Sequence, residues 1–100
     1  MNVKKRQERD RDLFLYRMGW DGDKNHTLFE TALRFELSVN QIFRNERKFA
    51  HTVLKSEKEE GANATMEKFQ LTELQLQQIK NSYNLEELHE YLVKIGAISE

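Results

Sequence analysis

The chain has 100 residues, which is enough for one domain, or for one domain with a short appendage. Its 38% hydrophobic content is too high for a disordered chain, and its lack of proline favours helices. Without cysteine it can form no disulfide, no thiolate metal site and no cysteine nucleophile. No apolar stretch is long enough to span a membrane, and the charged N-terminus does not resemble a signal peptide, so a cytoplasmic protein is expected.

The net charge of −1 is spread unevenly along the chain. Residues 1–60 carry thirteen Lys/Arg and eleven Asp/Glu, a net of +2, whereas residues 61–100 carry three and six, a net of −3. This asymmetry indicates that the first part could meet a polyanion while the second part meets solvent or a protein.

Hydrophobic periodicity, capping signals and glycines predict an all-α fold. The five expected helices cover residues 4–18, 27–36, 38–55, 70–83 and 84–95. These helices suggest a helix-turn-helix domain at 1–58, a linker at 59–70 and a two-helix C-terminal extension at 71–100. No internal repeat is apparent in the sequence.

The predicted helices at 27–36 and 38–55 are separated by only a short turn, which is the spacing of a helix-turn-helix. Thr27 and Ser38 begin the helices with capping boxes, because each is followed three residues later by Glu or Gln. The first helix should bury an apolar face made of Leu28, Ala32, Leu33 and Phe35. Ala32 is small where the helices should cross, Leu37 should point inward from the turn, and Ile42 should be the core contact of the second helix. The turn has Glu36 where such turns usually have glycine.

Residues from about Arg11 to Leu54 also resemble the fourth region of primary bacterial sigma factors. The similar residues are Tyr16-Arg17-Met18-Gly19-Trp20-Asp21-Gly22, Thr27-Leu28-Phe29-Glu30, Phe35-Glu36-Leu37-Ser38, Ile42, Glu46 and Lys48. The resemblance implies a DNA-binding helix-turn-helix and, as a protein partner, RNA polymerase.

In a helix-turn-helix the second helix enters the major groove of duplex DNA. We therefore expect Asn40 and Gln41 to reach base edges, since amides can pair with adenine. Basic side chains further along the helix should meet phosphates, and these are Arg44, Arg47 and Lys48.

Several positions depart from the sigma pattern and keep a second interpretation open. The family has arginine and glutamate where this chain has Val39 and Asn40, and a further arginine where it has Phe43. The chain could accordingly be a protein-interaction module that docks on RNA polymerase or another regulator without reading DNA. In that case Phe43 is a candidate partner contact, although packing in the interior is the expectation that we favour for it.

The stripe from Leu85 to Ile95 has the 3-4-3 spacing of an apolar helix face, with Leu88 and Leu92 at its centre. These leucines could form a homodimer seam or could fold back into the core. No catalytic motif, cofactor-binding loop or metal-ligand cluster is visible, so we expect neither an enzyme nor a cofactor or metal.

Overall fold

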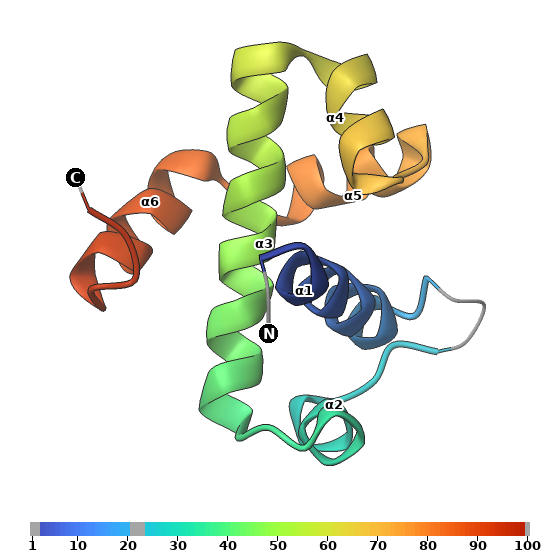
Figure 1. Cartoon of the computed structure of the whole chain (residues 1–100), viewed down its shortest axis with the longest axis vertical. Coiled ribbons are helices and arrows are strands. Elements are labelled where there is room, and N and C mark those ends of the chain that lie inside the picture. Colours follow the sequence, from blue (N-terminus) through green and yellow to red (C-terminus); the bar gives the residue numbers. More distant parts are fainter. Residues whose placement is uncertain (1–2, 21–23, 100) are drawn as a thin grey trace. The chain divides into compact units, whose positions relative to one another are not determined.

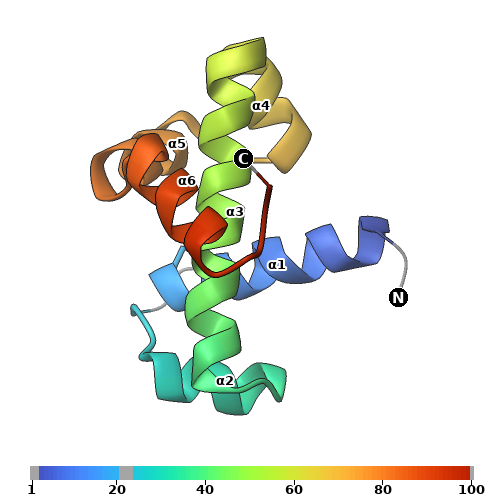
Figure 2. The same ribbon diagram turned by 90° about the vertical axis from the view of Figure 1, so that its left-hand side faces the viewer.

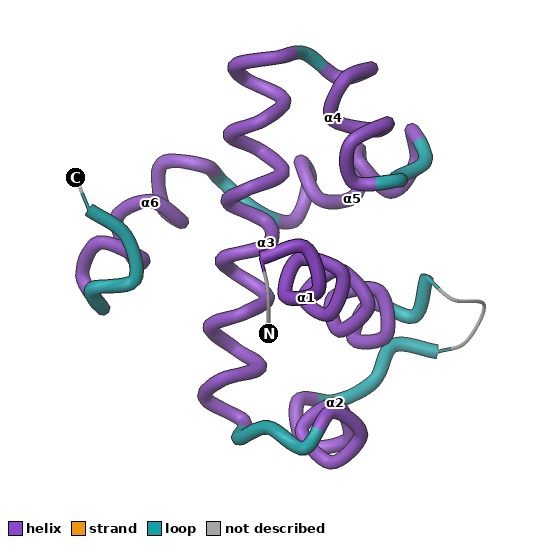
Figure 3. Tube along the Cα trace, in the orientation of Figure 1, coloured by secondary structure: helices purple, strands orange, loops and turns teal. Residues whose placement is uncertain are grey.

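The computed structural model describes residues 3–20 and 24–99, and within them every regular element is a helix (Figures 1 and 3). The predicted all-α fold is therefore confirmed. The helices are α1 (Val3–Met18), α2 (Leu28–Phe35), α3 (Val39–Glu60), α4 (Ala62–Phe69), α5 (Glu73–Ser82) and α6 (Leu85–Lys94). None of these helices combines the length and the apolar character that crossing a membrane requires.

Local signals in the sequence explain where several helices begin and end. The side chain of Thr27 accepts a hydrogen bond from the Glu30 backbone, and the Glu30 side chain accepts one from the Thr27 backbone. This capping box satisfies two amide groups that the first turn of α2 would otherwise leave unpaired. Gly19 and Gly96 both have a φ of 75°, a conformation that suits glycine after the last turn of a helix.

The chain divides into two compact units, an N-terminal unit of Met1–Phe49 and a C-terminal unit of Ala50–Glu100, and α3 runs from one into the other. In the N-terminal unit, α1 and α2 both cross the first half of α3 (Figures 1 and 2). Leu13 of α1, Ala32 of α2 and Ile42 of α3 form the core where these helices meet.

Partly buried apolar side chains surround this core, including Leu37 from the turn. Next to it, the buried ring of Phe14 lies 5.5 Å from that of Trp20 and 5.0 Å from that of Phe49. Trp20 therefore contributes to the interior of the N-terminal unit.

The C-terminal unit contains three helices besides the end of α3, not the two that the sequence predicted. Residues assigned to a linker form α4, which buries Thr65 and Phe69. The prediction missed this helix because its N-cap position is Gly61, which provides no side-chain hydrogen bond and reads as a loop residue. Within the helix, the Thr65 hydroxyl donates to the Gly61 carbonyl at 2.8 Å.

The structure also reveals a repeat that the sequence analysis did not find. The segments 27–42 and 61–76 share one local architecture, offset by 34 residues. Each has an eight-residue helix, one left-handed residue, a leucine, and a capping box that opens the next helix. Only four of the sixteen positions are identical, which explains why inspection of the sequence overlooked the repeat. These positions are Thr31 and Thr65, Phe35 and Phe69, Leu37 and Leu71, and Gln41 and Gln75.

Candidate functional site at the start of α3

The turn between α2 and α3 places the first turn of α3 at the surface. Glu36 ends α2 in the left-handed conformation, with φ 55° and ψ 43°, and its N–H donates to the Ala32 carbonyl. The Leu37 N–H donates to the same carbonyl at 3.1 Å. Glu36 therefore adopts the left-handed conformation for which glycine is usually required. The turn forms although this position holds a glutamate.

A reciprocal capping box begins α3. The Gln41 backbone N–H donates to Ser38 Oγ at 3.1 Å, and the Ser38 backbone N–H donates to Gln41 Oε1 at 2.9 Å. The predicted two-bond contact of Gln41 with adenine needs both its oxygen and its NH₂ group. Because the oxygen already accepts a hydrogen bond from Ser38, Gln41 would have to share this oxygen or give up the capping box to make that contact.

Two other predicted DNA-contact residues, Asn40 and Arg44, have exposed side chains that take no part in the capping box. They are four residues apart on α3, so they share one face of the helix. Asn40 lies in the first turn and Arg44 in the second. This face therefore presents an amide followed by a positive charge, which is the order that the sequence analysis expected for base and phosphate contacts.

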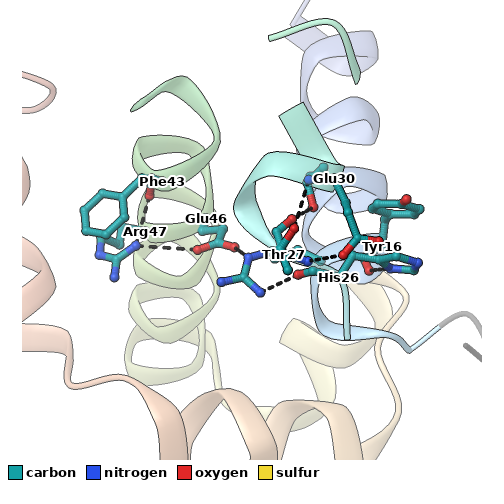
Figure 4. A network of polar contacts seen from close by, with 9 residues as sticks. Tyr16, His26, Thr27, Glu30, Phe43, Glu46 and Arg47 are labelled. Atoms are coloured by element: carbon teal, nitrogen blue, oxygen red, sulfur yellow. Dashed lines mark hydrogen bonds and ion pairs between the residues drawn. The ribbon is translucent and has the colours of Figure 1, made fainter. Parts of the chain in front are cut away.

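Arg47 has several partners within the protein (Figure 4). Its guanidinium carbon lies 3.3 Å from the centre of the Phe43 ring, and Nη1 donates to the Phe43 carbonyl at 3.1 Å. Nη1 also lies 3.5 Å from Glu46 Oε2. These contacts give both Phe43 and Arg47 structural partners, so each would have to give up contacts to serve as the partner or phosphate contact that we predicted.

Glu46 is the buried centre of this network. Its Oε1 lies 2.6 Å from Arg17 Nε, which links α3 to the end of α1. Burial raises the pKa of the Glu46 carboxyl, while the guanidiniums of Arg17 and Arg47 act in the opposite direction. Glu46, which matched the sigma pattern, is thus an interior ion-pair partner that fixes α3 against α1. The remaining predicted phosphate contact, Lys48, is half-buried.

An apolar surface on α2 was not predicted from the sequence. Leu33, which we expected to lie on the buried face of α2, is 67% exposed, and Phe29 is 66% exposed. They are four residues apart and therefore share a face of α2. Val39 at the start of α3 is also exposed, at 40%. The four-residue spacing of Phe29 and Leu33 was the sequence signal for this surface. However, the apolar residues of so short a helix lie on several sides of it, so the sequence did not show which side is buried.

Leu88 and Leu92, the predicted partner-binding residues of the C-terminal stripe, are only 5% and 0% exposed in the single chain. They belong to the interior, so the proposed homodimer seam lacks the side chains on which it depended.

Two residues of the sigma resemblance, Asp21 and Gly22, lie outside the described residues. In the described part of the chain, no three histidine or carboxylate side chains come together in a way that could hold a metal ion. Comparison with protein-family models, with curated proteins and with solved structures gives no significant match to this chain.

Proposed function

We propose that this chain is a small DNA-binding transcription regulator that uses α2, the turn and α3 as a helix-turn-helix. In this proposal the first two turns of α3 enter the major groove of duplex DNA and the regulator acts at RNA polymerase. The observation that carries the proposal is the exposed face of Asn40 and Arg44 directly after a tight turn that is held by the core.

The chemistry of this face fits the two kinds of contact that DNA recognition requires. Asn40 retains both a donor and an acceptor that can pair with an adenine edge. Arg44 is an exposed cation one turn further on, where side chains reach phosphates. Arg47 should contribute less than Arg44, because contact with a phosphate would compete with Phe43 and Glu46.

Titration of the protein with duplex DNA at two salt concentrations tests the proposal. Arg44→Ala should weaken binding to all sequences alike and should lower the salt slope by about one unit, the value for one lost phosphate contact. Asn40→Ala should cost about 1–3 kcal/mol on the preferred site and little on random DNA.

The repeat supplies a matched control, because Gln78 occupies on α5 the position that Arg44 occupies on α3. Gln78→Ala should leave DNA binding unchanged. If Arg44→Ala and Gln78→Ala both bind DNA as the unmodified protein does, α3 is not the DNA-contact helix.

The exposed apolar residues favour one alternative, a module that docks on RNA polymerase or another regulator without reading DNA. Monomeric proteins rarely leave large neighbouring apolar side chains in solvent without a partner. A polymerase pull-down with Leu33→Ser separates the two candidates. If Leu33→Ser no longer captures polymerase but still binds DNA normally, α2 is the surface for the protein partner. If Leu33→Ser loses capture and the unmodified protein does not bind DNA at all, the alternative is established.

A further inference from the structure

Two histidines meet inside the C-terminal unit, far from the proposed DNA-contact face in sequence. Nε2 of His51, on α3, lies 3.4 Å from Nδ1 of His89, on α6. Their ring centres are 5.6 Å apart, with the planes 30° from parallel. His51 is buried, whereas His89 is exposed. The two residues are 38 positions apart in the chain, so their contact joins α6 to α3.

The hydrogen bond between the rings sets a limit on the number of protons that the pair can hold. One nitrogen must donate and the other must keep its lone pair in order to accept. The pair can satisfy this condition when both rings are neutral or when one is charged. When both rings are charged, two N–H groups face one another and two positive charges lie side by side. The second proton therefore replaces an attraction with a repulsion.

The groups around the pair act in both directions. A pocket beside it is lined from α3 by Lys55, Lys58 and Glu59, and from α6 by Glu86 and Glu90. Three carboxylates and two lysines therefore line this pocket, so both signs of charge lie beside the pair. Burial is the dominant influence on His51 and lowers its pKa, and the charges of His89 and Lys55 lower it further.

We propose that His51 and His89 form a pH-sensitive latch that holds α6 on α3 when at most one ring is charged and releases it when both are. In the unfolded chain His51 takes up a proton near its ordinary pKa of 6.5, and in the folded chain only at a lower pH. Between these two values the unfolded chain binds more protons, so the stability of the folded unit falls as the pH falls. Release of α6 would expose Leu88 and Leu92, which are buried in the closed form.

Hydrogen exchange of the backbone amides, measured on the full chain, tests the latch. Spectra are recorded from about pH 7.5 to about pH 5, the range in which histidines change charge, with a chelator present to exclude bound metals. After correction for the intrinsic exchange rate, α6 should lose protection as the pH falls, while α2 should keep it. Trp20 fluorescence should stay constant, because this residue reports on the N-terminal unit.

Three variants make the experiment decisive. His51→Gln should keep α6 protected at the lower pH, because no charge can form at the buried position. His89→Gln should lose less protection than the unmodified chain, because the second charge is absent. His26→Gln is the control, since His26 stacks on Tyr16 in the N-terminal unit, and it should behave as the unmodified chain does.

If His51→Gln does not fold, His89→Gln decides the question alone. The latch is refuted if α6 protection is independent of pH in the unmodified chain. It is equally refuted if the folded histidine variants lose protection at the same pH and to the same extent as the unmodified chain.

Discussion

The two turns of this protein, one joining α2 to α3 and the other joining α4 to α5, have the same local construction but are followed by helices with different surface chemistry. Glu36 and Gln70 adopt almost the same left-handed conformation, with φ of 55° and 54°. Leu37 and Leu71 each donate a hydrogen bond to the helix carbonyl five residues earlier, at 3.1 Å and 2.9 Å. The threonines Thr31 and Thr65 are both fully buried, and each hydroxyl donates to the carbonyl four residues earlier at 2.8 Å.

The helices that follow the two turns differ in charge. The positions of Arg44, Arg47 and Lys48 on α3 correspond to Gln78, Asn81 and Ser82 on α5. Lys80, the basic residue of α5, lies 2.8 Å from Glu57 in an ion pair. The same turn is therefore followed by basic side chains in one unit and by amide and hydroxyl side chains at the corresponding positions in the other. The turn determines where a helix begins, and the exposed side chains determine what that helix can bind.

The largest difference between the two turns should come from substituting the residue at the helix crossing and measuring the free energy of unfolding. Ala32→Leu should reduce the free energy of unfolding by about 1–3 kcal/mol, because the added side chain would overfill the contact between α2 and its neighbours. The equivalent residue of the second turn is Met66, which is already long and is half-buried. Met66→Leu conserves volume and should cost less than about 1.5 kcal/mol.

Urea unfolding followed by Trp20 fluorescence and by circular dichroism measures both variants. Equal losses for Ala32→Leu and Met66→Leu would mean that the first turn is no more tightly packed than the second.

The sequence predicted most of the helices because their ends carry local signals. Thr27, Ser38 and Thr72 begin helices through side-chain hydrogen bonds that depend on residues only three positions away. The missed helix α4 lacks such a signal at Gly61 and depends on tertiary burial of Phe69. Local chemistry can be found in a sequence, whereas a helix that forms because its neighbours cover it cannot.

The same distinction applies to the candidate site. Asn40 and Arg44 were predicted and are exposed, because position along an amphipathic helix largely determines exposure. The ion pair of Glu46 with Arg17 could not be predicted in the same way, because Arg17 comes from α1 and reaches Glu46 only in the folded chain.

Removal of the caps should affect both turns to a similar and moderate extent. Ser38→Ala and Thr72→Ala should each cost about 0.5–2 kcal/mol, because each leaves a backbone N–H of the first helical turn without its acceptor. Thermal unfolding measures the stability loss, and the DNA titration provides the contrast between the turns. Ser38→Ala should also weaken DNA binding, since it loosens the helix that carries Asn40, whereas Thr72→Ala should not. Equal effects of the two variants on DNA binding would show that the cap contributes only to overall stability.

The smallest effect should come from the left-handed residues themselves, and it should be a gain. A side chain in this conformation costs roughly 1–2 kcal/mol, and glycine removes that cost while losing about 0.5–1 kcal/mol through its greater freedom in the unfolded chain. Gln70→Gly should therefore stabilise the protein by about 0.5 kcal/mol, because the Gln70 side chain is exposed.

Glu36→Gly should stabilise slightly more than Gln70→Gly, because it also removes a negative charge from the C-terminal end of α2, where the helix dipole disfavours one. Glu36→Gln isolates this electrostatic part, since it gives both turns the same residue, and it should contribute about 0.3 kcal/mol at low salt. Unfolding curves at low and high salt distinguish the two parts, because screening removes the charge effect and leaves the conformational gain. A loss of stability in both glycine variants would mean that the side chains of Glu36 and Gln70 stabilise their turns by more than the left-handed backbone costs.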